Sequence, residues 1–178
     1  PEDFKNEVQI VNTVLSVDQD NSPEITALFG SSLATCISQV PFNGPVAGVK
    51  VGRVNGKLVI NPTVEESEAS DIDLTVSGTK DAINMVEAGS KEVSEEDMLE
   101  ALMFGHEAIK ELIAFQEKII EEIGVEKYDY PKLEISKELI EEVTNLVKDK
   151  IDSALRIKEK QEKYAALDLS LIHISEPT

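Results

Sequence analysis

The sequence has few of the features that would place a chain in a membrane or give it a cysteine-based site. Only one of its 178 residues is cysteine, which excludes an internal disulfide framework and a zinc site built from cysteines. No run of about 18 apolar residues could span a bilayer, and the opening PEDFKNEVQI lacks the basic and apolar regions of a secretory signal. We expect a soluble, cytoplasmic protein with no membrane partner. The missing initiator methionine suggests that the natural start lies upstream.

Positive charge is also scarce. The chain has 17 Lys and Arg residues against 35 Asp and Glu residues, a formal net charge of −18. Because broad binding to a phosphate backbone needs a basic face, this charge argues against it and favours a solvated acidic surface. Hydrophobic residues still make up 41% of the chain, which predicts one domain with a core, or one domain plus part of another.

Several common catalytic motifs are missing. Cys36 lies among small and apolar residues in SSLATCISQV, so a packed core thiol is favoured over a nucleophile. His106 lies beside the apolar stripe of a predicted helix, which favours a satisfied histidine over a catalytic base. The chain contains no GxSxG elbow, no GxxxxGK[ST] loop and no GxGxxG after a strand. Triad hydrolysis and these types of nucleotide binding are therefore disfavoured.

The first third of the chain alternates strand, helix and strand signals. Residues 7–17 are rich in β-branched residues, which predicts a strand. A helix is expected over residues 24–39, with Asn21 or Ser22 as its cap and Pro23 in its first turn. Residues 46–63 predict a hairpin turning at Asn55-Gly56, a pair suited to a type I′ turn.

Further strands and two long helices are expected beyond the hairpin. Residues 71–79 and 82–89 predict an antiparallel pair. The SEED sequence begins a helix capped by Ser94, in which Asp97 would reach back to the cap, and Gly124 ends it. A linker at 125–134 would precede a second long helix from Ser136 to about Leu167. The fold class is α/β (α+β), with a mixed or antiparallel sheet, packed helices and an all-helical segment.

One acidic cluster could hold a metal ion. The segment EESEASDID contains the carboxylates Glu65, Glu66, Glu68, Asp71 and Asp73 in a predicted loop that enters a strand. Carboxylate oxygens are ligands that Mg²⁺ prefers, together with water and phosphate. An exposed acidic turn is the simpler interpretation, and the composition favours it.

A series of short motifs then carries a family resemblance. FNGP, VNGKLVINPT, DLTVSGT, MVEAG and FGHE occur in this order, and residues 1–168 closely resemble the first RNase PH-type core of the bacterial polynucleotide phosphorylase family. RIKEKQEKYAAL resembles the all-helical segment that joins the two cores of that family. The resemblance implies three parts: the C-terminal part of the first core at residues 1–124, the start of the helical segment at 125–168, and a foreign tail at 169–178.

The tail is interpreted as an artefact. LSLIHISEPT, residues 169–178, is the in-frame translation of a transposase adapter used in sequencing-library preparation, and all ten residues match. His173 would then have no biological meaning. By the same resemblance Pro1 falls inside the first core, so the strands and basic loop that precede it in the family are expected to be missing.

The resemblance implies an activity for the parent protein. Members of the family degrade single-stranded RNA from its 3′ end by phosphorolysis: inorganic phosphate attacks the terminal phosphodiester, with Mg²⁺ support, and nucleoside diphosphates are released. The family forms a ring-shaped homotrimer that can join RNA-degradation complexes, and its catalytic groups belong to the second core. The first core is expected to be non-catalytic and to guide RNA at the mouth of the channel.

Four residues are the candidate sites in this first core. Asn21-Ser22-Pro23-Glu24 stands where the active core has a Gly-Ser-rich phosphate loop, while Glu65 and Asp71 fall where it has two metal-associated aspartates. These two are expected to be at most a remnant of a metal site. Lys50 and Arg53 are the expected RNA-phosphate contacts, with surface solubilisation as the alternative. For the whole chain, a stand-alone, non-catalytic ring subunit that binds RNA or protein is the alternative function.

Overall fold

The chain folds into two compact units. The computed structural model describes residues 1, 3–18, 20–132 and 135–175, and the side chains up to residue 168. One unit runs from Pro1 to Pro131 and the other begins at Lys132, inside the segment that was expected to be a linker. Among the described residues, no helix is long and apolar enough to cross a membrane.

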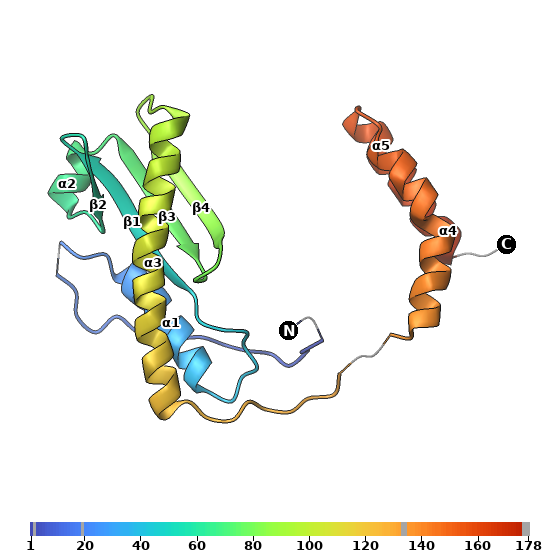
Figure 1. Cartoon of the computed structure of the whole chain (residues 1–178), viewed down its shortest axis with the longest axis horizontal. Coiled ribbons are helices and arrows are strands. Elements are labelled where there is room, and N and C mark those ends of the chain that lie inside the picture. Colours follow the sequence, from blue (N-terminus) through green and yellow to red (C-terminus); the bar gives the residue numbers. More distant parts are fainter. Residues whose placement is uncertain (2, 19, 133–134, 176–178) are drawn as a thin grey trace. The chain divides into compact units, whose positions relative to one another are not determined.

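A four-stranded antiparallel sheet forms the centre of the first unit, in the order β2-β1-β3-β4 (Figure 1). The strands are β1 (Ala47–Val54), β2 (Lys57–Ile60), β3 (Ile72–Gly78) and β4 (Ile83–Ser90). Asn55 and Gly56 join β1 to β2 with positive φ angles of 51° and 75°, as a type I′ turn requires. The expected hairpin and the expected antiparallel pair are therefore confirmed, as is the α+β fold class.

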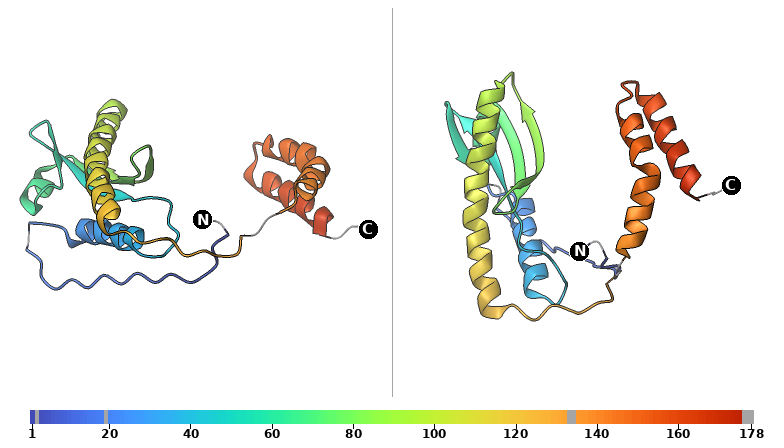
Figure 2. Two further views of the ribbon diagram at one scale, coloured as in Figure 1. Left: turned by 60° about the horizontal axis from the view of Figure 1, so that its bottom comes forward. Right: turned by 45° about the vertical axis from the view of Figure 1, so that its right-hand side comes forward.

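The long helix α3 (Glu95–Ile123) lies along one face of this sheet (Figures 1 and 2). Alternate residues of β1 and β3 point toward it, because successive side chains of a strand face opposite sides. The shared core consists of Ala47, Val49, Val51, Ile72, Leu74, Val76, Ala101, Ile109 and Ile113. Gly124 ends α3 as expected. Ser94 accepts a hydrogen bond from the amide of Asp97.

Helix α1 (Pro23–Ile37) packs against the other face of β1, near its beginning. A methyl group at Gly48 would lie 2.4 Å from Cδ2 of Leu28, so the glycine allows the close approach of α1. Helix α1 also contacts α3, where Phe29 of α1 and Phe115 of α3 stack with their ring centroids 6.1 Å apart. The first unit therefore has a helix on each face of its sheet, and the expected helix over residues 24–39 is confirmed.

The predicted strand at residues 7–17 is wrong for this structure. The segment is extended but pairs with no strand of the described chain. Val11 is 73% exposed and Leu15 92% exposed, and the side chain of Asn12 bonds to the Ser31 hydroxyl of α1 at 2.9 Å. The β-branched pattern indicated the extended backbone correctly, but a strand also needs a neighbour to accept and donate its backbone hydrogen bonds.

The three glutamates of the acidic cluster are helical rather than in a loop, whereas Asp71 precedes β3 and Asp73 lies within it. Helix α2 (Val64–Ala69) contains Glu65 and begins with a capping box, in which the Thr63 hydroxyl accepts from the amide of Glu66 and the Glu66 carboxylate accepts from the amide of Thr63. This reciprocal pair satisfies two amides that a short helix would otherwise leave unbonded. The expectation of a loop at this position was therefore wrong.

The second unit is a pair of helices, α4 (Lys137–Leu155) and α5 (Lys160–Ser175), so the single long helix expected from Ser136 to Leu167 is wrong. The break follows Leu155, and the Glu159 carboxylate accepts from the amide of Glu162 at 2.7 Å to start α5. Contact between the two helices buries Val147 and Ala154. One straight helix would leave that apolar stripe without a partner. The expected foreign tail lies in α5 as far as Ser175, and residues 176–178 lie outside the described residues.

The close approach of α3 to the sheet predicts that Gly105→Ala destabilises the first unit. The added methyl group would lie 2.6 Å from Cγ1 of Val76 and 3.0 Å from Cγ2 of Val51. Overpacking of this kind costs about 1–3 kcal/mol of unfolding free energy, measurable by urea unfolding followed by circular dichroism. Gly30→Ala in α1 is the matched control, because nothing lies within 4 Å of its new methyl group. An equal loss of stability in both variants would contradict the packing explanation.

Candidate functional site

Arg53 joins three elements of the first unit. From β1, its Nε and Nη2 atoms donate to Oδ1 and Oδ2 of Asp71 at 2.9 and 2.7 Å. Its Nη1 atom lies 2.9 Å from Oδ2 of Asp97, in the first turn of α3. The bidentate geometry with Asp71 is the strongest form of a guanidinium–carboxylate contact. The Asp97 carboxylate thus bonds to Arg53, which the SEED pattern had not predicted, as well as to the side chain of its cap, Ser94.

The backbone before β3 holds Asp71 in place for this contact. The buried hydroxyl of Ser70 accepts from the amide of Arg53 at 2.7 Å and donates to the carbonyl of Ile72 at 2.6 Å. The Lys91 ammonium donates to the carbonyl of Ser70 at 2.9 Å, and the Lys91 amide donates to the carbonyl of Asp71. The position of the carboxylate is thus set by hydrogen bonds on both sides of it.

The ion cluster shifts the pKa of each of its members. Hydrogen bonds from Arg53 are the main reason why the pKa values of Asp71 and Asp97 lie below their usual range. The same bonds raise the pKa of Arg53. The Arg53 side chain is 19% exposed, against 41% for Asp71 and 44% for Asp97, so the cluster lies at the surface with its cation innermost.

The two predicted RNA contacts do not form one site. Lys50 and Arg53 lie an odd number of residues apart on β1 and therefore point to opposite faces of the sheet. Arg53 lies on the α3 face, with its charge paired to two carboxylates. An RNA phosphate at Arg53 would have to displace one of them. Lys50 lies on the opposite face, in a polar hollow.

The two predicted metal residues are not arranged as a metal site. Glu65 is exposed on α2, and both carboxylate oxygens of Asp71 accept hydrogen bonds from Arg53. Within the described part of the chain, no group of three or more His, Cys, Asp and Glu residues could hold an ion. A guanidinium thus already neutralises the carboxylate that Mg²⁺ would need, and the residues present do not fit the ion.

The polar hollow around Lys50 is the best candidate for a functional surface in the described chain. Lys50 is paired across the sheet with Thr75, and Thr75 with Glu87, so the three form a row across β1, β3 and β4. Glu24 of α1 and Asp73 of β3 complete its charged lining, and its volume is about 570 Å³. The hollow has three carboxylates around one ammonium, so it is suited to cations or hydrogen-bond donors rather than to phosphate.

The beginning of α1 borders the hollow and is already occupied by an anion of the chain itself. Pro23 stands in the first turn, where it contributes no amide donor. The Ser22 hydroxyl donates to the Glu24 carboxylate. This bond, the backbone amide of Glu24 and the charge of Lys50 lower the pKa of Glu24. The helix end that could attract a phosphate therefore holds a carboxylate.

Neither Cys36 nor His106 lines the hollow around Lys50. Cys36 is 4% exposed, and burial raises the pKa of its thiol, as expected for a packed core thiol. His106 is 6% exposed, and its Nε2 atom lies 3.0 Å from the carbonyl oxygen of Thr79. Both residues are satisfied within the fold, in agreement with the sequence interpretation.

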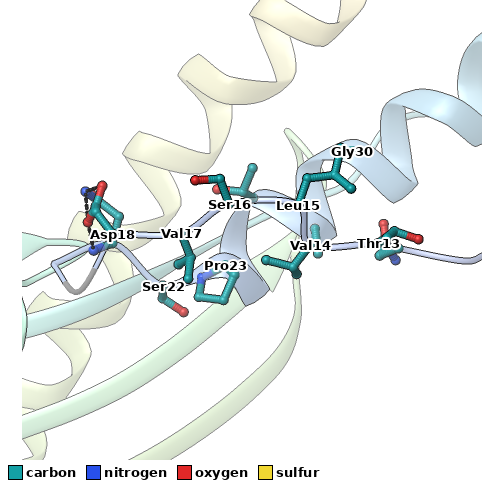
Figure 3. Close-up of a pocket in the computed structure, with 13 residues that line it drawn as sticks. Thr13, Val14, Leu15, Ser16, Val17, Asp18, Ser22, Pro23 and Gly30 are labelled. Carbon is teal, nitrogen blue, oxygen red and sulfur yellow. Dashed lines mark hydrogen bonds between the residues drawn. The ribbon is translucent and has the colours of Figure 1, made fainter.

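A second hollow lies between α1 and the extended segment before it. Figure 3 shows Thr13 to Asp18 running past α1, with Ser22, Pro23 and Gly30 beside them. The volume of this hollow is about 760 Å³. The Asp18 carboxylate accepts hydrogen bonds from the amides of Asp20 and Asn21, which ends the segment in a tight turn. Asp18 is the one charged residue among the described residues that line this hollow, and the other polar residues of the lining are neutral.

Comparison with known proteins agrees with the family resemblance. Residues 44–108 match the family described as 3′ exoribonuclease family, domain 2. The chain is 58% identical over 165 residues to a polyribonucleotide nucleotidyltransferase of Bacillus velezensis, which aligns 93% of this chain with 23% of that protein. Proteins of the same name from Oceanobacillus iheyensis and Enterococcus faecalis are each 54% identical, aligning 94% of this chain with 24% of theirs. The chain thus spans about a quarter of the length of these relatives.

The fold is similar to that of a solved structure. The crystal structure of rice (Oryza sativa) Rrp46 aligns with 59% of this chain and 51% of its own, with a TM-score of 0.51 and 16% identity. At this identity the likeness concerns the fold alone. The family match at residues 44–108 covers the sheet and the first half of α3, which are the elements that position Arg53 and Lys50.

The ion cluster predicts how Arg53→Met changes stability with pH. The variant loses both carboxylate contacts, and at neutral pH we expect a lower urea midpoint than for Lys80→Met, which removes only the exposed pair with Glu117. Because the pKa values of Asp71 and Asp97 are depressed in the folded state, their contribution is complete above about pH 4 and disappears as the pH falls through the folded values. The measurement is urea unfolding of both variants at several pH values.

A loss of stability in Arg53→Met that stayed constant down to the acid limit would contradict this ion-pair account. It would indicate that the packing of the Arg53 side chain, rather than its charge, stabilises the first unit.

Proposed function

We propose, from the premise that this chain is a close relative of the polyribonucleotide nucleotidyltransferases over more than nine tenths of its length, that it forms part of a phosphorolytic 3′-to-5′ exoribonuclease. In the complete protein, inorganic phosphate attacks the terminal phosphodiester of single-stranded RNA. The bond to the 3′ oxygen of the preceding nucleotide breaks, and a nucleoside diphosphate leaves. We propose a cytoplasmic role in messenger RNA turnover, in a homotrimer that can join other RNA-degrading proteins.

We assign the chain to the non-catalytic first core of that enzyme. The observation that carries this assignment is the Glu24 carboxylate at the start of α1. The reaction accumulates negative charge on phosphoryl oxygens and is accelerated by cations and hydrogen-bond donors placed around them. The Glu24 carboxylate is negative where the reaction needs a positive charge. Pro23 beside it has no amide N–H to donate to a phosphoryl oxygen. The hollow around Lys50 therefore does not suit the attacking phosphate.

Mg²⁺ is assigned to another part of the complete enzyme. Asp71 is bound by Arg53, so we place no step of the reaction on Glu65 or Asp71. The proposed role of this core is to shape and support the ring. Of the two predicted RNA contacts, Arg53 is paired to two carboxylates, so Lys50 is the remaining candidate, although the three carboxylates that line its hollow disfavour a phosphate there.

A graft tests the proposal. The segment of the Bacillus velezensis enzyme that aligns with this chain would be replaced by the 165 aligned residues of this chain, and phosphorolysis of a labelled oligoribonucleotide would be measured with phosphate and Mg²⁺. We expect the graft to release nucleoside diphosphates only when phosphate is present. Glu24→Gln and Asp73→Asn in the graft should leave its turnover unchanged, since these residues face a hollow that takes no part in the reaction.

Two results would overturn the proposal in different ways. A folded graft that binds RNA but releases no diphosphate would remove the phosphorolytic assignment and support a stand-alone ring subunit. A loss of turnover of about a hundredfold or more in Asp73→Asn would show that the first core is itself catalytic.

A further inference from the structure

We propose that residues 125–130, here called the strap, are a docked part of the first unit, and that Lys127 holds the strap against the end of α1. The sequence indicated a linker at this position. In the structure the strap directly follows α3 and bonds to α1, to the residues after it and to the start of the chain. Lys127 would therefore be the residue that decides where the ordered core ends and the connection to the helical pair begins.

The Lys127 ammonium binds three backbone oxygens at the end of α1. Its Nζ atom donates to the carbonyl oxygens of Thr35, Cys36 and Ser38 at 3.4, 2.5 and 2.7 Å. An ammonium has three protons to donate, and all of them have an acceptor here. Lys127 thus caps the end of α1, although the two lie far apart in the sequence.

The carbonyl groups that end α1 depend on this cap. The last four carbonyls of a helix have no partner inside it. In α1, the carbonyl of Ala34 accepts from the amide of Ser38. The carbonyl of Cys36 accepts from the Lys127 ammonium, and the carbonyl of Ile37 accepts from the amide of Val125 at 3.4 Å. Helix α1 has no basic residue in its own last turn. Lys127 therefore supplies the positive charge that the negative end of the helix dipole favours.

Two further contacts continue the docking along the strap. The amide of Tyr128 donates to the carbonyl of Gln39 at 2.7 Å. The Tyr130 hydroxyl donates to the carboxylate of Asp3 at 2.9 Å, and its ring meets that of Phe4 edge-on with centroids 5.2 Å apart. The strap thus connects the end of α3, the end of α1 and the first residues of the chain.

Amide hydrogen exchange on residues 1–178 tests the proposal with Lys127→Met. We expect the amides of Val125 and Tyr128 to exchange about tenfold to a hundredfold faster in this variant, as fits the loss of hydrogen bonds to a charged donor. The amides of β1 and β3 should keep their rates, because the ammonium of Lys127 donates to the end of α1 and to the residue after it. Lys132→Met is the matched control, since it removes an equal charge just beyond the strap.

Unchanged exchange at Val125 and Tyr128 would overturn the proposal, as would an equal acceleration in the sheet, which would mean that Lys127 supports only global stability. Reaction of the unaltered chain with an amine-acetylating reagent gives an independent answer even if the variant does not fold. Lys127 should be modified more slowly than Lys132, because its ammonium is held by three carbonyls. Equal rates would also overturn the proposal.

Discussion

The contact between α3 and the apolar face of the sheet positions the other features of the first unit. Gly105 lets the helix approach β1 and β3 closely enough that a single methyl group would collide with Val76. Once the helix lies there, its first turn brings Asp97 to Arg53, and its later turns bring the amide group of Gln116 to the carbonyl of Val46 at 2.9 Å. The Oε1 atom of Gln116 is buried without a hydrogen-bond partner among the described residues. The strap then leaves the end of α3 at the place where α1 ends.

Three of the 17 Lys and Arg residues of this acidic chain connect elements of the first unit. Arg53 joins β1 to the start of β3 and to α3, and Lys127 joins the strap to α1. Lys91 donates to a backbone carbonyl beside the ion cluster. A charge that is paired inside the fold is not available to a phosphate backbone, whatever its position in the sequence. The pairing of these cations inside the fold is a stronger argument than the net charge against RNA binding by the described part of the first unit alone.

Local patterns predicted the elements whose partners lie nearby. The positive φ angles at Asn55 and Gly56 follow from residue types, and the pairing of β3 with β4 follows from two short apolar runs beside each other. The strand predicted at residues 7–17 was wrong, since a strand depends on a pairing partner that can lie far along the chain. The single helix predicted at 136–167 was wrong, since the chain there turns back and packs as two helices. The ion cluster was also missed, because Asp97 looked like half of a capping box. Only the packing of α3 shows that its carboxylate is directed to β1. The hollow could have been anticipated from Asp73, Thr75 and Ser77, polar residues at alternate positions of β3 that mark the face away from α3.

Helix α1 is bonded at both of its ends by charged side chains of the chain itself. Each end of a helix presents unbonded backbone groups and part of a dipole, and either end can serve as a binding site. Here the start of α1 holds the carboxylate of Glu24 and the end holds the ammonium of Lys127. Both charges have the sign that the dipole stabilises, and both belong to the chain itself. A helix satisfied at both ends is a rigid support between the hollow and the strap, and it has no end left for an external anion or cation.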